Sequence, residues 1–220
     1  MKKVLITGAG GQLGSSMELE DFIMITTSRF HNDAVESPTI DADLDITNEY
    51  QVKTIIAEND PDIIVHLAAM TNVDGCELNP DQAYEVNVRG TVNLLNHFNG
   101  KFVLLSTDYV FDGNEGPYSE NDTVNPKNVY GKTKLEAERK VREFSADWLI
   151  LRTNVVWNIG GKYKASFVDW LVEELDEGNQ VRIVTDQWNN PTHTEDLGCV
   201  INELLKHDAS GLYHYGSAEV

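Results

Sequence analysis

The first fourteen residues join a short apolar segment to three regularly spaced glycines. Residues 2–7 (KKVLIT) are typical of a buried strand, and a G-x-x-G-x-x-G pattern follows at once. Glycines at this spacing allow a tight turn, a close approach of the backbone to a pyrophosphate, and close packing of a following helix. We expect that helix over residues 11–19, with its first N–H groups directed at the phosphates. The predicted dinucleotide-binding loop comprises Gly8, Gly10, Gly11, Gln12, Leu13 and Gly14.

Strand and helix patterns alternate from residue 2 to about residue 152. Further strands are expected at 22–26, 62–69, 102–106 and 146–151, and helices at 48–58 (with Thr47 as N-cap), 79–99 and 130–144. Such alternation indicates an α/β fold, here a Rossmann-like doubly wound parallel sheet. We therefore assign residues 1–152 to a dinucleotide-binding domain.

Residues 153–220 depart from this alternation. We expect a helix at 164–177 with a core-like apolar stripe, a short strand at 181–184, a helix starting at Thr194 or Asp196, and a last strand at 212–215. These residues are predicted to form a small substrate-side lobe interleaved with the last elements of the sheet.

Composition excludes several classes of protein. A net charge of −19, from 36 acidic and 17 basic residues, argues against a surface for nucleic acid or another polyanion. The excess charge fits either a high-salt habitat or an acidic solubilising surface. No run approaches the ~20 apolar residues of a membrane span, and the apolar run after the N-terminus is too short for a signal peptide, so we expect a cytoplasmic location. Cys76 and Cys199 lie far apart, which predicts neither a disulfide framework nor a metal site.

Several residues near the predicted strand ends are candidates for cofactor binding. Arg29 follows the second strand where NAD-preferring sites often carry an acid, so it could meet a 2′-phosphate or be a solvated loop residue. Asp45 and Ile46 could border an adenine, although Asp45 could equally cap a turn. The small segment Ala68-Ala69-Met70 suits a cofactor lying across the strand ends. Asn87 could orient a backbone segment or be a partly exposed helix residue, and His66 is more typical of the core.

Thr107, Tyr130 and Lys134 form a candidate proton-transfer site. Thr107 stands where a buried strand would leave the sheet, and active-site groups of open α/β sheets gather at those ends. Tyr130 and Lys134 are four residues apart, so they share one face of a helix. A nearby ammonium should lower the phenol pKa from about 10, and the Thr107 hydroxyl could hold a carbonyl against the phenol. Tyr-x-x-x-Lys alone is a weak signal, but the glycine loop strengthens it.

Together these motifs resemble the extended short-chain dehydrogenase/reductases. More narrowly, LLSTDYVFDG (104–113), VYGKTKLEAE (129–138) and TDQWNNPTHTEDL (185–197) are similar to the dTDP-4-dehydrorhamnose reductase family, over nearly the whole chain. The resemblance implies reduction of the 4-keto group of a dTDP-linked 4-dehydro-6-deoxy sugar by NADPH or NADH. It implies that Tyr130 donates the proton, that Lys134 also holds the nicotinamide ribose, and that Thr107 bonds the carbonyl oxygen. The implied substrate residues are Thr71, Val73, Ser106, Asp108, Val110, Asn154, Trp157 and Gln187.

The sequence also departs from the family pattern. Asn189 replaces the usual glycine of the DQ-x-G-x-PT block, and Met70 follows the alanines where the family usually has a tyrosine. The family usually continues beyond a segment like GLYHYGSAEV, so we expect the substrate-side lobe to be incomplete. Because the family includes dimers, the resemblance leaves a homodimer open.

Two rival functions follow from the same resemblance. A nucleotide-sugar epimerase or dehydratase is one, but a dehydratase would be expected to carry an acidic pair after the Ser/Thr, and here Asp108 stands alone. A non-catalytic regulatory subunit, like that of methionine adenosyltransferase, is the other, and the intact catalytic trio weighs against it.

Overall fold

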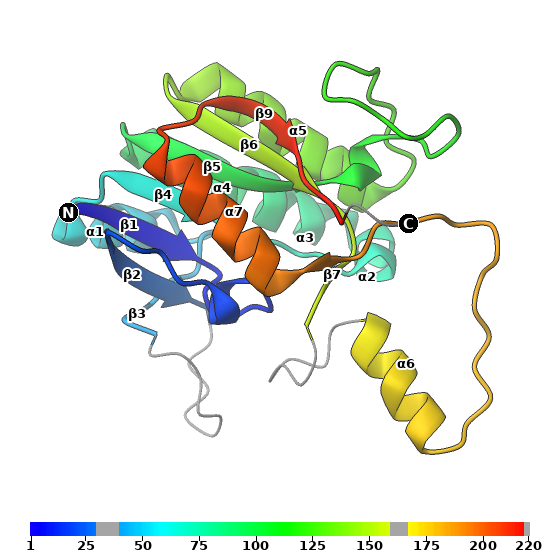
Figure 1. Cartoon of the computed structure of the whole chain (residues 1–220). Coiled ribbons are helices and arrows are strands. Elements are labelled where there is room, and N and C mark those ends of the chain that lie inside the picture. The colour runs from blue at the N-terminus through cyan, green and yellow to red at the C-terminus, as the bar shows by residue number, and fades with distance from the viewer. Residues whose placement is uncertain (30–39, 159–166, 218–220) are drawn as a thin grey trace.

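The computed structural model describes residues 1–29, 40–158 and 167–217, and its centre is a seven-stranded parallel sheet (Figure 1). The strands are β1 Lys2–Thr7, β2 Phe22–Ser28, β3 Ala42–Asp43, β4 Ile63–His66, β5 Lys101–Thr107, β6 Trp148–Thr153 and β9 Gly211–His214. Their order is β3-β2-β1-β4-β5-β6-β9, and every neighbouring pair is parallel. The order reverses between β1 and β4, so a cleft is expected outside the carboxyl ends of these strands. The predicted doubly wound sheet is confirmed.

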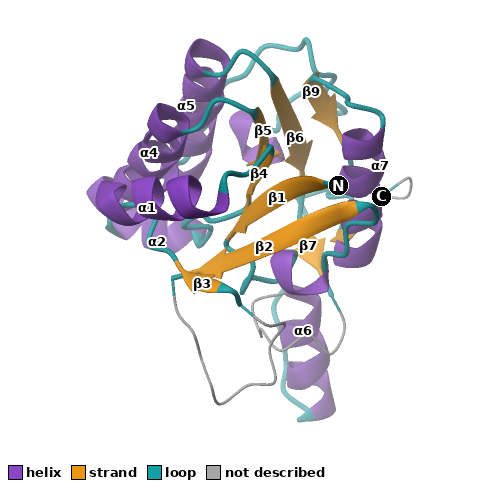
Figure 2. Ribbon diagram, turned by 90° about the vertical axis from the view of Figure 1, so that its left-hand side faces the viewer, coloured by secondary structure: helices purple, strands orange, loops and turns teal. Residues whose placement is uncertain are grey.

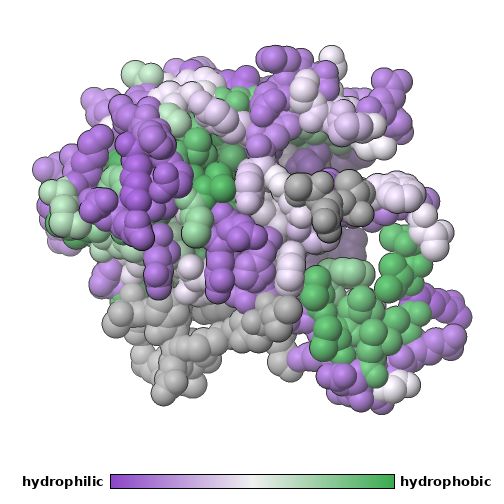
Figure 3. Space-filling model, viewed as in Figure 1, coloured by the Kyte–Doolittle hydropathy of each residue, from purple (hydrophilic) through white to green (hydrophobic). Residues whose placement is uncertain are grey.

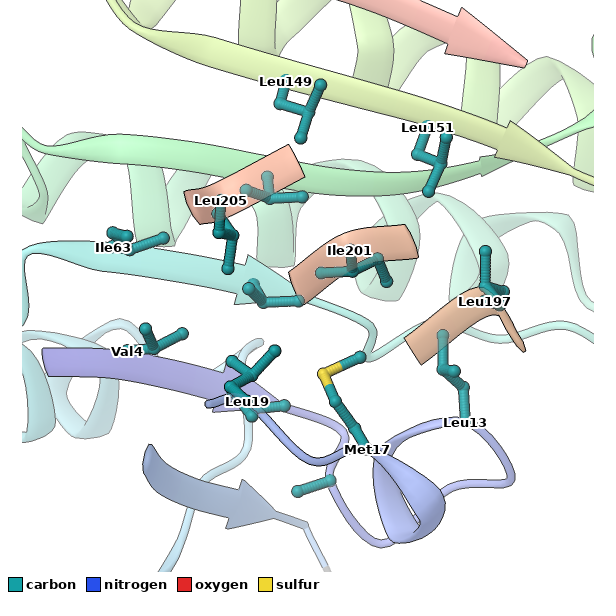
Figure 4. Packing of buried hydrophobic residues seen from close by; sticks show 14 residues of the cluster. Val4, Leu13, Met17, Leu19, Ile63, Leu149, Leu151, Leu197, Ile201 and Leu205 are labelled. Atoms are coloured by element: carbon teal, nitrogen blue, oxygen red, sulfur yellow. The ribbon is translucent and has the colours of Figure 1, made fainter. Parts of the chain in front are cut away.

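Helices cover both faces of the sheet (Figure 2). Helices α1 (Glu49–Asn59), α4 (Gly90–His97) and α5 (Val129–Phe144) lie on one face, where Leu5, Ile64, Leu104 and Ile150 are buried. Helix α7 (Thr194–Lys206) lies on the other. Figure 4 shows that face, where Leu197, Ile201 and Leu205 of α7 meet Val4, Ile63, Leu149 and Leu151 of the strands. Burial on both faces explains why these strands read as continuous apolar runs.

The helix expected over residues 11–19 is absent, which corrects the sequence prediction. Only one turn of 3₁₀ helix forms there, η1 (Gly14–Ser16). The Ser15 and Ser16 hydroxyls donate to the carbonyls of Gln12 and Leu13, each at 3.1 Å, and compete with a helical backbone ladder. The chain then turns extended at Met17, whose side chain packs into the core under α7 (Figure 4).

Two other helix predictions need correction. Asn48, not Thr47, caps α1: its side chain accepts from the Gln51 N–H, while the Thr47 hydroxyl is bonded to Asp45. The segment predicted as one helix at 79–99 is α3 (Pro80–Tyr84), a π-helical turn η2 (Glu85–Arg89) and α4. A short helix, α2 (Val73–Leu78), precedes it and was not predicted. Single π-helical turns inside α-helices are frequent at functional sites.

The region after β6 contains a second, two-stranded sheet and one outlying helix. Strands β7 (Val156–Trp157) and β8 (Thr192–His193) pair in parallel, and neither was predicted. The predicted strand at 181–184 does not form: no described strand pairs with it, and Ile183 and Val184 are exposed. None of the described helices is long and apolar enough to cross a membrane.

Helix α6 (Phe167–Asp176) stands away from the sheet and its covering helices (Figure 1). Its predicted start at residue 164 lies outside the described residues. No residue of α6 is buried, and the expected core stripe is instead an apolar surface (Figure 3), with Trp170 40% and Leu175 56% exposed. The core prediction is wrong, because every residue of the stripe stays at least partly exposed.

Candidate active site

The glycine loop packs directly against the exit of β4. Gly8 has φ +73°, and a Cβ there would lie 2.6 Å from the Ala68 backbone nitrogen. A Cβ at Gly14 would lie 2.5 Å from the Ala9 Cα. Both positions therefore require glycine, and they leave bare backbone at the switch point of the sheet. This arrangement fits the close approach of a pyrophosphate.

Gln12 and Leu13 of the loop have structural partners. With its amide oriented to satisfy both ends, Gln12 donates to the Val156 carbonyl at 3.1 Å and accepts from the Asn158 N–H at 3.2 Å. Leu13 is buried in the core under α7. Gly10 is also buried, whereas Gly11 is exposed. The loop is thus anchored to the small β7–β8 sheet as well as to β4.

The predicted adenine-side residues lie at the ends of β2 and β3. Arg29 is exposed directly after β2. The Asp45 carboxylate accepts from both the N–H and the hydroxyl of Thr47, at 2.9 and 2.7 Å. Asp45 therefore caps the turn before α1, as its alternative interpretation proposed. Ile46 is buried against Gly90, where a Cβ would lie 2.6 Å from the Ile46 Cδ1.

The segment after β4 is held by the side chain of Asn87. Its Oδ1 accepts from the Met70 N–H at 2.7 Å, and its Nδ2 donates to the Met70 carbonyl at 3.1 Å. The same Nδ2 donates to Thr133 at 2.9 Å. Ala68 and Ala69 are half-buried beside the glycine loop. Asn87, placed on the π-helical turn, therefore fixes the backbone where a cofactor is predicted to lie.

Thr107 and Tyr130 come together at the end of β5. Gly131 allows this, because α5 passes so near Tyr109 that a Cβ at Gly131 would lie 2.1 Å from the Tyr109 carbonyl oxygen. The Tyr130 phenol lies beside Thr107, whose side chain lowers the pKa of the phenol. The Thr107 hydroxyl donates to Asp108 Oδ1 at 3.1 Å and accepts from the Tyr109 N–H at 3.2 Å. The end of β5 thus brings Thr107 and the Tyr130 phenol together.

The pKa of Tyr130 differs from the sequence prediction. Burial raises the pKa of its phenol above the ordinary value, whereas the neighbouring Thr107 side chain lowers it; Asp108, Cys76 and Tyr109 raise it further. Lys134 was expected to lower this pKa but is not among the groups that shift it. The phenol therefore keeps its proton at neutral pH, which suits a proton donor. Burial also raises the pKa of the Asp108 carboxyl, against the lowering effect of the Thr107 hydrogen bond.

Lys134 is a buried cation without a counter-ion. The residue is 4% exposed, and its ammonium makes no hydrogen bond or ion pair to any described residue. Burial lowers its pKa from 10.5 to about 8, while Glu138 raises it. Buried charges in proteins are normally paired, so an unpaired one marks a site that a ligand completes. Together with the bare backbone at Gly8 and Gly14, Lys134 fits a dinucleotide.

Ser106 faces a buried ion pair, which the sequence did not foresee. Its hydroxyl donates to Glu138 Oε1 at 2.6 Å, and Glu138 binds Arg152 through two hydrogen bonds of 2.8 and 2.7 Å. All three residues are at most 4% exposed. Val110 is likewise fully buried and packs with Phe111 and Leu135. Both are placed as core residues, so a substrate role for either stays a prediction.

The remaining predicted substrate residues come from several segments. Thr71 is exposed and Val73 half-buried at the start of α2, which packs on α5. Asn154, with its amide oriented to suit both ends, bonds the backbone of Asn190. Gln187 lies exposed on the segment between α6 and β8. A substrate role for each of these residues stays a prediction.

Trp157 supplies an unused donor in this region. Its ring stacks edge-on against His193, with 4.9 Å between the ring centroids. The indole N–H is buried and has no hydrogen-bond partner among the residues that the structure describes. A buried donor without a partner costs free energy, so this N–H is available to a ligand.

Sequence reasoning missed residues that hold the catalytic helix. The Glu77 carboxylate accepts from the Val129 N–H at 2.6 Å and so caps α5 from α2, together with Asn128. Thr133 donates to the Tyr130 carbonyl at 2.8 Å. Thr133 stands inside the YGKTK motif and could have been singled out by its place one turn after Tyr130. No local signal marks Glu77, because its partner is 52 residues away.

The chain is similar to a known protein family and to several characterised proteins. The family model for the RmlD substrate binding domain matches residues 1–220. A dTDP-4-dehydrorhamnose reductase of Aggregatibacter actinomycetemcomitans is 36% identical over 228 residues, covering 98% of this chain and 73% of that protein. Methionine adenosyltransferase 2 subunit beta of Danio rerio is 32% identical over 231 residues, covering 99% and 69%.

A solved structure agrees with these sequence matches. The dTDP-4-dehydrorhamnose reductase of Bacillus anthracis, determined in complex with NADP, superposes with a TM-score of 0.84 at 35% identity. The match covers 98% of this chain and 74% of that one. Sequence and fold lead to the same conclusion: the chain belongs to the RmlD substrate binding domain family.

Proposed function

We propose that this protein reduces the 4-keto group of a dTDP-4-dehydro-6-deoxy sugar with NADPH or NADH. One observation carries the proposal: at the carboxyl end of β5, the Tyr130 phenol lies beside Thr107, and Lys134, which has no ion-pair partner among the described residues, is buried one turn further along the same helix. The similarity to reductases, one of them solved with NADP, supports the same reaction.

The protein's own groups handle the proton. The bound nicotinamide supplies the hydride. Tyr130 gives its phenolic proton to the carbonyl oxygen as that oxygen gains negative charge, which yields the hydroxyl of the product. Lys134 supplies a buried positive charge that would hold the ribose of the bound nicotinamide. Thr107 lies beside the phenol, where its hydroxyl would help to hold the carbonyl oxygen against the phenol.

Two rivals receive less support. A regulatory subunit needs no proton donor, yet this chain retains Thr107, Tyr130 and the costly buried charge of Lys134. An epimerase or dehydratase of the same superfamily would use a similar cofactor site. The acid beside the tyrosine is the half-buried Asp108, and no second acid follows it directly along the chain. The reductase therefore accounts best for the site.

A substrate panel tests the proposal. The protein is incubated with NADPH or NADH and a set of dTDP-4-keto sugars, and loss of the reduced nicotinamide absorbance is followed. Oxidation of the cofactor with formation of a dTDP-6-deoxy sugar supports the reductase. Conversion of the sugar without net loss of cofactor would support an epimerase or dehydratase, and cofactor binding without turnover of any sugar would support the regulatory subunit.

Arg29 gives the first testable prediction. Arg29→Ala is expected to raise the KM for NADPH several-fold and to leave the KM for NADH nearly unchanged, because only NADPH carries the 2′-phosphate that a guanidinium would bind. Arg89→Ala is the matched control, since Arg89 is an exposed arginine paired with Glu85 on η2. Equal effects of Arg29→Ala on both cofactors would remove Arg29 from the phosphate site.

Three broader assignments complete the proposal. Residues 1–152 form the cofactor domain, and residues 153–220 contribute the substrate-side lobe, although α7 and β9 complete the main sheet. A cytoplasmic location suits a nucleotide-sugar substrate. The homodimer stays a prediction, which sedimentation of the protein with and without cofactor would test.

A further inference from the structure

A chain of buried hydrogen bonds crosses the molecule between the glycine loop and the catalytic helix. Its members are Thr7 of β1, His66 of β4, Thr91 of α4, Asn87 of η2 and Thr133 of α5, each at most 5% exposed. Three of them, Thr7, His66 and Thr91, have no part in the mechanism above. Such a fully satisfied polar network inside a core is costly to build and fixes one arrangement of its members.

The first hydrogen bonds of this network pass through His66. Thr7 Oγ1 lies 2.7 Å from His66 Nδ1, and His66 Nε2 lies 3.1 Å from Thr91 Oγ1. The Thr91 hydroxyl donates to the Asn87 carbonyl at 2.8 Å, so it must accept from His66. His66 is therefore neutral with its proton on Nε2, and Nδ1 accepts from Thr7. Burial and the nearby Lys134 lower the pKa of His66 to about 3, in keeping with this neutral form.

The other hydrogen bonds of this network reach the backbone after β4 on one side and the turn that carries Tyr130 on the other. Thr7 Oγ1 accepts from the Ala68 N–H at 3.4 Å, and Asn87 holds both backbone groups of Met70. Asn87 also donates to Thr133, which donates to the Tyr130 carbonyl at 2.8 Å. The backbone predicted to face the cofactor and the turn that carries Tyr130 therefore share one set of hydrogen bonds.

We propose that Thr7, His66 and Thr91 are positioning residues, which set the cofactor-facing backbone at Ala68–Met70 and the Tyr130 turn in register with each other. The part of this inference that concerns the Tyr130 turn rests on the proposed function. The part that concerns the cofactor-facing backbone does not depend on it. Loss of one link lets the two sides shift separately, and a misplacement of about 1 Å can cost about 10² in rate.

Thr91 is the position for the test. Thr91→Val keeps the shape and removes both hydrogen bonds, whereas Thr91→Ser keeps the hydroxyl. We expect Thr91→Val to raise the Kd for NADPH about ten-fold and to lower kcat by about 10² at temperatures well below its Tm. Thr91→Ser should restore both to near the wild-type values. Asn202→Ala is the control, because it removes a partly buried hydrogen bond to the Glu20 N–H on the opposite face of the sheet.

The outcomes separate positioning from simple stability. If Thr91→Val lowers Tm as Asn202→Ala does but leaves Kd and kcat unchanged, the network is only structural and the proposal is overturned. Nitrogen NMR of the imidazole adds an independent measurement: a proton on Nδ1 of His66, or a doubly protonated ring at pH 6, would also overturn it. If the wild type shows no reductase activity, the Kd for NADPH of Thr91→Val, compared with that of the wild type, still tests whether the network positions the cofactor-facing backbone.

Discussion

Tyr130→Phe is expected to lower kcat by about 10² to 10⁴ while cofactor binding is retained, because positioned acid catalysis is worth that much. The substitution keeps the aromatic ring and its edge-on contact with Tyr109, 5.8 Å between centroids, and removes only the hydroxyl. The raised pKa of Tyr130 means that the wild-type phenol carries its proton throughout the neutral range. The loss is therefore that of the acid itself, and steady-state kinetics with saturating NADPH would measure it.

A neighbouring tyrosine provides the control for this experiment. Tyr109→Phe removes a hydroxyl from the partner ring, which is 39% exposed, and should change kcat by less than about two-fold. Thr107→Val should lower kcat but less than Tyr130→Phe, since it removes only the hydroxyl that would help to hold the carbonyl oxygen. A Tyr130→Phe enzyme with near-wild-type kcat would exclude Tyr130 as the proton donor and would favour the regulatory-subunit function instead.

Lys134→Met is expected to abolish most activity and, at the same time, to stabilise the protein without cofactor. A lysine whose pKa falls from 10.5 to about 8 on folding costs the folded state about 3 kcal/mol while it is charged. Methionine has a similar length and no charge, so it removes this cost at neutral pH. Thermal unfolding should show the higher Tm of Lys134→Met, and titration with NADPH should show its weaker binding.

The pH dependence of this effect has a definite sign. Between pH 8 and 10.5 the unfolded chain holds the Lys134 proton and the folded protein has released it, so the unfolded state binds more protons and stability rises with pH. The stability difference between wild type and Lys134→Met should therefore be largest below pH 8 and vanish toward pH 10.5. Lys132→Met, at an exposed position of the same helix, should show neither effect. A Lys134→Met protein less stable than wild type at pH 7 would contradict the unpaired buried charge.

The sequence predicted the parts of the site whose signals are local. Strand β1 with its glycine loop is recognisable because apolar residues and obligatory glycines occupy fixed neighbouring positions. Tyr130 and Lys134 are linked by the helical repeat alone. Thr107 could be placed because the apolar run of β5 ends there.

The errors arose where a side chain meets distant partners. Ser106 is a hydroxyl at a strand end, yet it bonds Glu138, 32 residues away. The Tyr130 pKa depends on burial, which residue spacing does not report. The apolar stripe of α6 has core composition, and only the folded arrangement reveals that none of its residues is buried. Local rules identify which groups are present, whereas their environments follow from contacts far apart in the chain.

The position of α7 and β9 in the chain has a consequence for synthesis on the ribosome. Strands β1 to β6 are complete at Thr153, but α7, which covers one face of the sheet, ends at Lys206, and β9, which pairs with β6, ends at His214. At about 5 to 20 residues per second, a nascent chain spends about 3 to 12 seconds with that face uncovered and β6 as a bare edge. Apolar faces and open strand edges are what chaperones protect. We therefore expect folding yield to depend on chaperone supply during this interval.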